Sequence, residues 1–354
     1  MPSARLLFLA DTHLGFDLPF RPRVDRRRRG PDFFANFERA LLPALRGEVD
    51  LVLHGGDLFY RSKVPPVLIE MALAPLLKVA ERGVPVYIVP GNHERSRLPL
   101  HLLTTHENMH IFDRPRTYLC QLPAGTLALS GFPFFRQVGV RFPYLVCSSG
   151  YQDVRADARF LCIHQAVEGA KVGVSNYTFR SGADVIQGQG IPAGFSAVLS
   201  GHIHRAQRLS HDLQGRSLPA PVFYPGSTER TSFAEREEDK GYLLLTIQLS
   251  GQDRGVLAEA SFNPLPTRPM VSLTLDPEAP DVSVLLDLVS RRLRPLDPDA
   301  VVRVQMRGPH SRWACDTLSA AVLRELAPRT MNITLAIDRA AFERNRRDPS
   351  RVPL

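Results

Sequence analysis

The segment Arg5-Leu6-Leu7-Phe8-Leu9-Ala10, near the start of the chain, is followed at once by Asp11-Thr12-His13. A run this short and this apolar is typical of a β-strand that is buried on both faces. Two later segments repeat the pattern: Asp50–His54 (DLVLH) leads into Gly55-Gly56-Asp57, and Pro85–Val89 (PVYIV) leads into Gly91-Asn92-His93. Apolar residues at helical spacing separate the three strands, over Asp32–Arg46 and Pro65–Arg82. Together these segments predict strand–helix–strand units in which each strand ends in polar residues.

Closely spaced strands replace this alternation beyond residue 115. The predicted strands are Thr117–Leu122, Thr126–Ser130, Arg159–Ile163, Ala197–Ser200, Val222–Tyr224 and Tyr242–Gln248. Strand–helix–strand units followed by such strands favour mixed sheets packed face to face with helices outside, here over residues 1–262. The Pro-rich segment 263–269 (NPLPTRP) predicts a linker to a small α+β domain at 270–338. Residues 339–354, with five arginines and few core residues, predict a flexible tail.

Histidines end two more of the predicted strands, at His164 and at Gly201-His202-Ile203-His204. In open α/β sheets, ligands collect beyond the carboxyl ends of the strands, so segments far apart in sequence can meet there. Eight side chains form the candidate set: Asp11, His13, Asp57, Asn92, His93, His164, His202 and His204. Oxygen and imidazole donors without thiolate suit manganese, iron or zinc. Because one ion takes three or four protein ligands, the set predicts two divalent ions that activate water for attack on a phosphate ester.

The composition excludes some classes of protein and leaves others open. The formal net charge is +8, and 40 of the 44 basic residues are arginine, since only Lys63, Lys78, Lys171 and Lys240 are lysines. This excess is compatible with a polyanionic partner, but a GC-rich genome would also produce it. The sequence contains neither a transmembrane run nor a signal peptide, and its four scattered cysteines predict a reducing, cytoplasmic setting.

The ordered set D-x-H, G-D, G-N-H, H and G-H-x-H resembles the calcineurin-like metallophosphoesterase superfamily. More narrowly, the chain resembles the SbcD-type DNA double-strand-break repair nucleases. Three segments carry the narrower match: Asp11-Thr12-His13-Leu14-Gly15, Gly55-Gly56-Asp57-Leu58-Phe59 and Tyr224-Pro225-Gly226-Ser227-Thr228-Glu229-Arg230, the last of which continues to Phe233 and then to Lys240-Gly241-Tyr242. The match covers residues 5–250, and the C-terminal domain fits the family's capping domain in position and size only. The resemblance implies a four-layer α/β (α+β) fold of two mixed β-sheets with helices outside, plus a small α+β capping domain that binds DNA.

The resemblance also implies a function and a division of the site. The chain would be a DNA exonuclease or endonuclease that acts in double-strand-break repair or end processing. Asp11, His13, Asp57 and His204 would hold one ion, and the bridging Asp57 with Asn92, His164 and His202 would hold the other. Mn²⁺ is the expected metal, with Mg²⁺, Fe²⁺ or Zn²⁺ as alternatives. His93 would bind no metal, and would instead stabilise developing charge at the scissile phosphate or protonate the leaving oxygen.

Partners and location follow from the same resemblance. DNA, a second copy of the chain and an SbcC-like SMC/ABC ATPase are the expected partners, although the segment that docks the ATPase is not evident in this chain. No membrane is expected, and the location would be the cytoplasm, in association with the nucleoid. The predicted dimer would form through helices of the phosphoesterase domain.

Further residues are candidates for supporting roles, and two of them depart from the family's pattern. His54 would orient Asp57. The loop residues Arg26, Arg27, Arg28 and Arg29 are either a solvated charge run or a phosphate-binding loop. Tyr60 stands where the family often has histidine or aspartate, so a DNA contact is its predicted role. Glu94 replaces the more usual aspartate after G-N-H.

Two other functions remain open on the sequence. A phosphatase or small-molecule phosphodiesterase of the same superfamily would use the same ligands, although Gly56-Asp57-Leu58-Phe59-Tyr60-Arg61-Ser62 lacks the G-D-x-x-D-R-G of Ser/Thr phosphatases. A non-catalytic subunit that binds DNA ends would use the fold as a scaffold, and the intact ligand set argues against that alternative.

Overall fold

The computed structural model describes residues 3–19, 26–94, 106–249 and 255–336. The chain divides into two compact units, Met1–Pro19 with Arg29–Thr267, and Phe20–Arg28 with Arg268–Leu354. The predicted tail at 339–354 lies outside the described residues. Among the described residues, no helix combines the length and apolar character needed to cross a bilayer.

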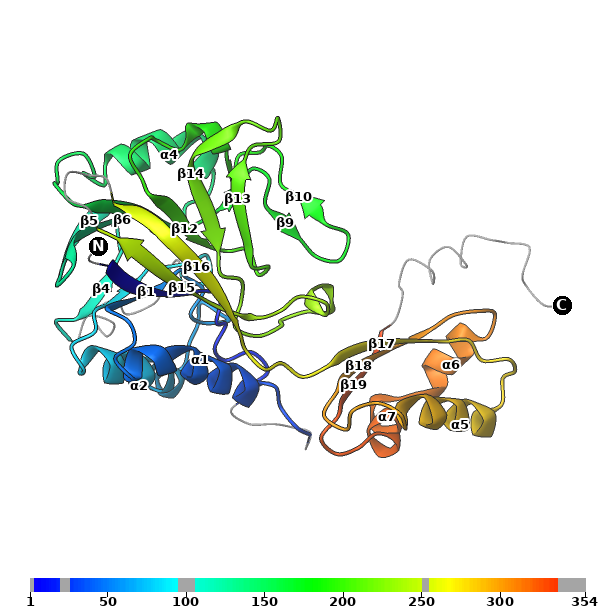
Figure 1. The fold of residues 1–354 in the computed structure, drawn as a ribbon. Helices are drawn as coiled ribbons and strands as arrows, with labels where there is room; N and C mark the ends of the chain where they lie inside the picture. Colours follow the sequence, from blue (N-terminus) through cyan, green and yellow to red (C-terminus); the bar gives the residue numbers. More distant parts are fainter. Residues whose placement is uncertain (1–2, 20–25, 95–105, 250–254, 337–354) are drawn as a thin grey trace. The chain divides into compact units, whose positions relative to one another are not determined.

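The first sheet of the larger unit has the strand order β16-β15-β1-β2-β3-β4. Figure 1 labels its strands β1, β4, β15 and β16. Its strands are β1 (Ser3–Leu9), β2 (Leu51–His54), β3 (Val86–Ile88), β4 (Met109–Ile111), β15 (Gly241–Gln248) and β16 (Val256–Pro264). The four strands from β1 to β4 pair in parallel, whereas β15 is antiparallel to both β1 and β16. The sheet is therefore mixed, and its parallel half carries the three strands predicted from the opening segments.

The second sheet has the order β13-β14-β12-β7-β6-β5. Its strands are β5 (Arg116–Leu122), β6 (Gly125–Gly131), β7 (Ala158–His164), β12 (Ala197–Gly201), β13 (Gln207–His211) and β14 (Ser217–Tyr224). The four inner strands pair in parallel, and both edge strands are antiparallel to their neighbours. Two short ribbons, β8 (Ala166–Val167) with β11 (Val185–Ile186) and β9 (Lys171–Val172) with β10 (Tyr177–Thr178), follow β7.

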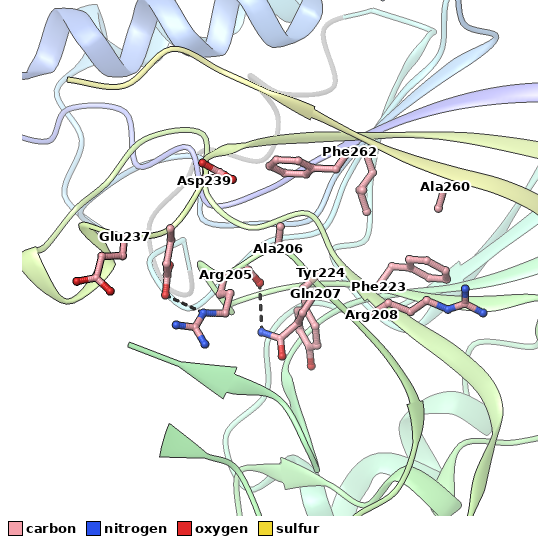
Figure 2. Close-up of a pocket in the computed structure, with 12 residues that line it drawn as sticks. Arg205, Ala206, Gln207, Arg208, Phe223, Tyr224, Glu237, Asp239, Ala260 and Phe262 are labelled. Carbon is pink, nitrogen blue, oxygen red and sulfur yellow. Dashed lines mark hydrogen bonds and ion pairs between the residues drawn. The ribbon is translucent and has the colours of Figure 1, made fainter. Parts of the chain in front are cut away.

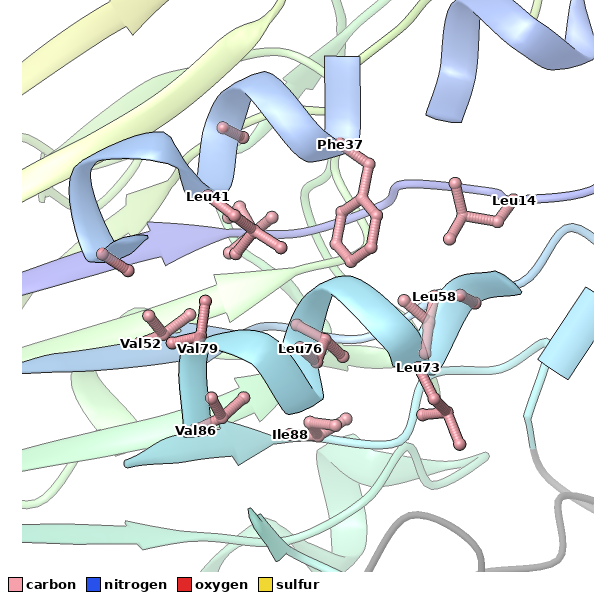
Figure 3. Close-up of a cluster of buried hydrophobic side chains, with 14 of the residues drawn as sticks. Leu14, Phe37, Leu41, Val52, Leu58, Leu73, Leu76, Val79, Val86 and Ile88 are labelled. Atoms are coloured by element: carbon pink, nitrogen blue, oxygen red, sulfur yellow. The ribbon is translucent and has the colours of Figure 1, made fainter. Parts of the chain in front are cut away.

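Successive side chains of β1 point to opposite faces of the sheet, and each face packs against a different layer. Leu7 and Leu9 face α1 (Gly30–Leu45) and α2 (Pro66–Ala80), in the apolar cluster drawn in Figure 3. Leu6 and Phe8 point the other way, into a cluster shared with the second sheet. Helix α4 (Val138–Cys147) covers the far face of that sheet. Each fully buried Leu or Phe contributes roughly 1.5–3 kcal/mol. The result is the predicted four-layer arrangement, so the predicted fold class is confirmed.

Several elements of this unit were not predicted from the sequence, namely the strands β4, β8–β11, β13 and β16 and the helix α4. The helix α4 contains Pro143, which argues against a helix, but its apolar face is buried on the second sheet. Strand β16 has mostly exposed side chains, so its sequence shows no alternation, and pairing with β15 forms it. This strand extends into the predicted linker, and Leu265 is buried against the core of the larger unit.

The smaller unit is a parallel three-stranded sheet with helices on one face. Its strands β17 (Met270–Leu275), β18 (Val301–Met306) and β19 (Asn332–Ala336) pair in that order. The helices α5 (Val282–Leu293), α6 (Ser311–Thr317) and α7 (Ala320–Leu326) share its apolar cluster. Asp281 caps α5 by accepting from the backbone N–H groups of Ser283 and Val284. This unit was predicted as α+β, and of the described residues it also includes 26–28.

Candidate metal centre

The candidate ligands meet where five strands of the larger unit end. Asp11 and His13 follow β1, Asp57 follows β2, Asn92 and His93 follow β3, and His164 ends β7, while His202 and His204 follow β12. Backbone hydrogen bonds from Asp11 N to Gly56 O (2.9 Å) and from His13 N to Asp57 O (3.0 Å) join the first two loops. Both sheets therefore contribute side chains to one site.

The backbone at this site is strained. Asp11, His13, Asp57 and His202 have φ values of 51°, 44°, 52° and 84°. Residues other than glycine rarely adopt such angles, which cost free energy unless the surroundings impose them. Gly91 shows how close the loops approach, because a Cβ at this position would lie 2.2 Å from Asp57 Oδ1. The fold thus holds the loops in one conformation that aims their side chains inward.

One group of donors is formed by Asp11, His13 and His204. Their nearest donor atoms all lie within 4.8 Å of one another. His13 Nε2 is 3.0 Å from His204 Nε2, which is itself 4.0 Å from Asp11 Oδ1. The other ring nitrogen of His13 is buried and has no hydrogen-bond partner among the described residues. Two imidazole nitrogens that face each other beside a carboxylate fit a shared cation.

A second group lies on the other side of Asp57. Asp57 Oδ2 is 3.5 Å from His164 Nε2, and that nitrogen is 3.2 Å from Asn92 Oδ1. The same amide oxygen is 3.0 Å from His202 Nδ1. Because Asp57 Oδ2 also lies 4.0 Å from His13 Nε2, this carboxylate can be shared by the two groups. Oxygen and imidazole donors at these separations could hold divalent metal ions, which agrees with the predicted kind of cofactor.

Buried hydrogen bonds fix the orientation of the histidines. His164 Nδ1 lies 2.7 Å from the carbonyl oxygen of Gly55, so Nδ1 carries the hydrogen of this bond. The other ring nitrogen, Nε2, is then the atom that can bind a metal ion in the site. His54 Nδ1 accepts from the backbone N–H of Gly56, and its Nε2 contacts Thr12 Oγ1 at 3.1 Å. His54 therefore contacts the loop that carries Asp57, while its role in orienting the Asp57 carboxylate stays a prediction.

Glu94 has a structural role that the sequence did not reveal. Its buried carboxylate accepts from the backbone N–H groups of Asp57 (3.0 Å), Phe59 (2.9 Å) and Gly91 (2.7 Å). Burial, together with the nearby Asp57 carboxylate, raises the pKa of Glu94 to about 8. This residue ties the loop after β2 to the loop after β3. The sequence marked it only as a departure from the usual aspartate, because its partners are distant along the chain.

Glu235 and Lys240 support His204, a role that the sequence revealed for neither residue. Glu235 Oε1 lies 3.2 Å from His204 Nδ1, and its other oxygen is 2.8 Å from Lys240 Nζ. The buried Lys240 ammonium also donates to the carbonyl oxygen of His204 at 2.8 Å. A carboxylate behind a histidine fixes the ring and strengthens the inward nitrogen as a metal ligand.

We expect Glu235→Gln to weaken metal binding by about 10- to 100-fold, because an amide replaces the anion behind His204. Titration of Mn²⁺ into metal-free protein, followed by calorimetry, measures this affinity. Glu237→Gln changes an exposed carboxylate two residues away and is the matched control. Equal affinities in the two variants would contradict the role given to Glu235.

The electrostatics of the site favour a cation. Burial raises the pKa of Asp11 to about 6. Burial acts on Asp57 in the same direction, but His164 and His13 outweigh it and hold the pKa of Asp57 well below its usual range. Burial lowers the pKa of His202 to about 3 and that of His13 well below its usual range. Burial also acts to lower the pKa of the other two histidines, but Asp57 and Asp11 outweigh it and raise the pKa of His164 to about 9, and Glu235 and Asp11 raise that of His204. A metal ion would therefore bind His13 and His202 as neutral imidazoles and would displace a proton from His164 and from His204.

His93 and Tyr60 lie at the open side of the site. His93 Nδ1 is 2.5 Å from the carbonyl oxygen of Tyr60, and its Nε2 is 3.7 Å from Asp57 Oδ2. The His93 side chain is 31% exposed, whereas that of Asp57 is 3% exposed. The ring of Tyr60 packs edge-on against Phe16 and lies 6.1 Å from the rings of His13 and His93. Both side chains are therefore placed where a ligand could reach them.

The four-arginine run divides between the two units. Arg29 is buried in the larger unit, where it pairs with Glu229 (3.2 Å) and donates to the carbonyl oxygen of Arg230. Arg26, Arg27 and Arg28 belong to the smaller unit, and Arg27 pairs with Asp299 at 2.7 Å. Arg29 thus has a structural role beside the segment that begins at Tyr224, whereas a DNA contact by the other three remains a prediction.

A cavity of about 510 Å³ opens beyond His204, between the loop before β13 and strands β14 to β16 (Figure 2). Arg205 lies at one end, where its Nε donates to Glu238 at 3.1 Å. Phe223 and Phe262 form apolar walls, and Arg208 stacks over the ring of Phe223. None of the eight candidate ligands lines this cavity, so the metal centre is a separate feature.

The profile of the calcineurin-like phosphoesterase family matches residues 4–206, which is more than half of the chain. The chain therefore belongs to this family, and the predicted superfamily is confirmed.

Curated proteins that resemble this chain share the name of a DNA repair protein. The chain is 30% identical over 321 residues to the DNA double-strand break repair protein Mre11 of Methanosarcina mazei, covering 87% of this chain and 46% of that protein. It is 30% identical over 314 residues to the protein of the same name from Haloferax volcanii, covering 86% and 61%. A dimetal phosphatase from Danio rerio is similar at 13% identity with a TM-score of 0.44, over 73% of this chain and 100% of that one. The chain spans about half the length of the curated relatives it matches.

Proposed function

We propose that this protein is a metal-dependent nuclease that hydrolyses phosphodiester bonds of DNA during double-strand-break repair or end processing. The observation that carries the proposal is the position of Asp57, whose carboxylate lies within 4.0 Å of donor nitrogens of His13, His93 and His164. Membership of the phosphoesterase family and the printed name of the relatives support the reaction and the substrate.

In this proposal the site holds two ions. Asp11, His13, Asp57 and His204 would bind one, and Asp57, Asn92, His164 and His202 would bind the other. When bound, such a pair supplies Lewis acidity to the phosphate and to the attacking water. Mn²⁺ is the proposed metal, because mixed carboxylate, amide and imidazole donors suit it.

His93 has a different role, which its exposure supports. Its Nδ1–H is held by the carbonyl oxygen of Tyr60, so Nε2 is the nitrogen that faces the site. From there it would stabilise charge on the phosphate or deliver a proton to the leaving oxygen. Glu94 and His54 would keep the loops of Asp57 in place during the reaction.

The test is cleavage of end-labelled single- and double-stranded DNA by the purified protein. Cleavage is expected with Mn²⁺ and should disappear with EDTA. Hydrolysis of p-nitrophenyl phosphate or cyclic nucleotides without DNA cleavage would replace the proposal with a phosphatase or small-molecule phosphodiesterase. Elemental analysis that finds no bound metal, with DNA binding but no hydrolysis, would indicate a non-catalytic subunit that binds DNA ends.

We further propose a homodimer, an SbcC-like ATPase partner and a cytoplasmic, nucleoid-associated location. Exposed apolar residues on the outer face of α2 support the dimer, since Val67 and Met71 are 46% and 44% exposed one turn apart. Light scattering should give twice the mass of the chain. Met71→Glu should reduce this mass to that of one chain. A wild-type protein with the mass of one chain would contradict the dimer.

A further inference from the structure

Helix α4 exposes two large apolar side chains on its outer face. Val140 is 84% exposed and Tyr144 is 74% exposed, the highest values for large hydrophobic side chains among the described residues. They lie four residues apart and so share one side of the helix. Isolated apolar side chains are common at surfaces, but a pair beside a cavity marks a binding surface more specifically.

A cavity of about 490 Å³ lies beside these residues. Its walls include Arg114, Phe135, Val140, Arg141, Tyr144 and Leu145, and no carboxylate is among its lining residues. Both arginines are exposed. The nearby acid, Asp113, is engaged with Arg116 at 2.6 Å and so is already neutralised. The cavity therefore combines apolar surface, one exposed aromatic ring and two positive charges.

A residue that lines this cavity is next in sequence to one that contacts the metal centre. Phe135 lines the cavity, and its carbonyl oxygen accepts a hydrogen bond from Gln165 Nε2 at 3.1 Å, directly after His164. The preceding residue, Phe134, has its ring 5.7 Å from that of His202 and 6.1 Å from that of His164. The segment Phe134–Phe135 thus contacts the candidate ligands His164 and His202 with one residue and lines the cavity with the next.

We propose that this cavity binds unpaired nucleotides of the DNA strand next to the scissile bond. A base would stack on Tyr144, and backbone phosphates would contact Arg114 and Arg141. Stacking on an exposed ring requires a base that is not paired, so the bound arm of the substrate is single-stranded. An acidic peptide would also pair with the arginines, but a DNA strand is the ligand that the neighbouring phosphoesterase site would also bind. This inference rests on the proposed nuclease function and specifies its substrate.

The test compares binding of a fluorescein-labelled oligothymidylate of twelve nucleotides by anisotropy, in EDTA so that no cleavage occurs. Tyr144→Ala and Arg141→Glu should each weaken binding by about tenfold, with a smaller salt dependence for Arg141→Glu. Tyr144→Phe should restore affinity, because it keeps the aromatic ring. Arg46→Glu makes the same charge change at an exposed position at the end of α1 and should bind as the wild type does.

The outcomes separate this proposal from the nuclease proposal. If the wild type cleaves DNA but Tyr144→Ala and Arg141→Glu bind the oligonucleotide as tightly as the wild type does, the cavity does not bind nucleotides. The proposed nuclease function would then still stand. No cleavage of DNA by the wild type would overturn the nuclease itself. Displacement of the oligonucleotide by an equal concentration of a Glu- and Leu-rich peptide would reassign the cavity to an acidic protein segment. Hydrolysis of bis-p-nitrophenyl phosphate, which is too small to span both sites, measures the metal centre of each variant separately.

Discussion

Asp57→Asn is expected to lower the rate of phosphodiester hydrolysis by about three orders of magnitude or more. The carboxylate is buried, and its Oδ2 lies 3.5 Å from His164 Nε2, 3.7 Å from His93 Nε2 and 4.0 Å from His13 Nε2. Asparagine keeps the shape but removes the negative charge that both proposed ions would share. The rate with Mn²⁺ and the metal content by elemental analysis together measure the effect.

The substitution tests charge with little disturbance of the backbone. Asp57 has a φ of 52°, a conformation that asparagine tolerates better than most residues. The backbone N–H of residue 57 can still donate to Glu94, so the loop should keep its hydrogen bonds. Asp153→Asn, at an exposed aspartate away from the site, is the control. A variant at position 57 that binds two equivalents of metal and cleaves at the wild-type rate would show that Asp57 does not bridge the ions.

The sequence predicted the parts of the fold that local patterns determine. The apolar runs before Asp11, Asp57 and His164 are strands, because each is buried on both sides between layers. Parallel pairing aligns the carboxyl ends within each sheet, and the packing of the two sheets brings both sets of ends together, so the eight residues predicted from five segments lie in one region. Strand β16 and helix α4 could not be predicted in this way, because pairing with β15 and burial against the second sheet stabilise them.

The supporting residues of the site show the same limit. Glu94 accepts hydrogen bonds from backbone groups up to 37 residues away in the sequence. Glu235 contacts the ring of His204, which precedes it by 31 residues. Acidic residues of this kind look like ordinary surface charges in a sequence. Arg29 is the opposite case: it belongs to a run that looks like a charged surface, yet the fold buries it against Glu229. Only the tertiary structure distinguishes these alternatives.

His93→Gln should separate metal binding from catalysis. The histidine is close enough to His13 and Asp57 to form a third potential metal group, whereas the proposed mechanism keeps it off the metal. We expect the variant to retain two equivalents of metal and to cleave DNA about 10²- to 10⁴-fold more slowly, because glutamine cannot transfer a proton. His211→Gln, at an exposed histidine on β13, is the control for the loss of an imidazole.

The leaving group then distinguishes the two roles left to His93. DNA cleavage expels an alkoxide, which needs a proton, whereas bis-p-nitrophenyl phosphate expels a phenolate that leaves without one. If Nε2 of His93 protonates the leaving oxygen, His93→Gln should slow DNA cleavage far more than hydrolysis of the p-nitrophenyl ester. If the imidazole only stabilises charge on the phosphate, both substrates should slow by similar factors. Loss of one metal equivalent in the variant would contradict both roles and make His93 a ligand.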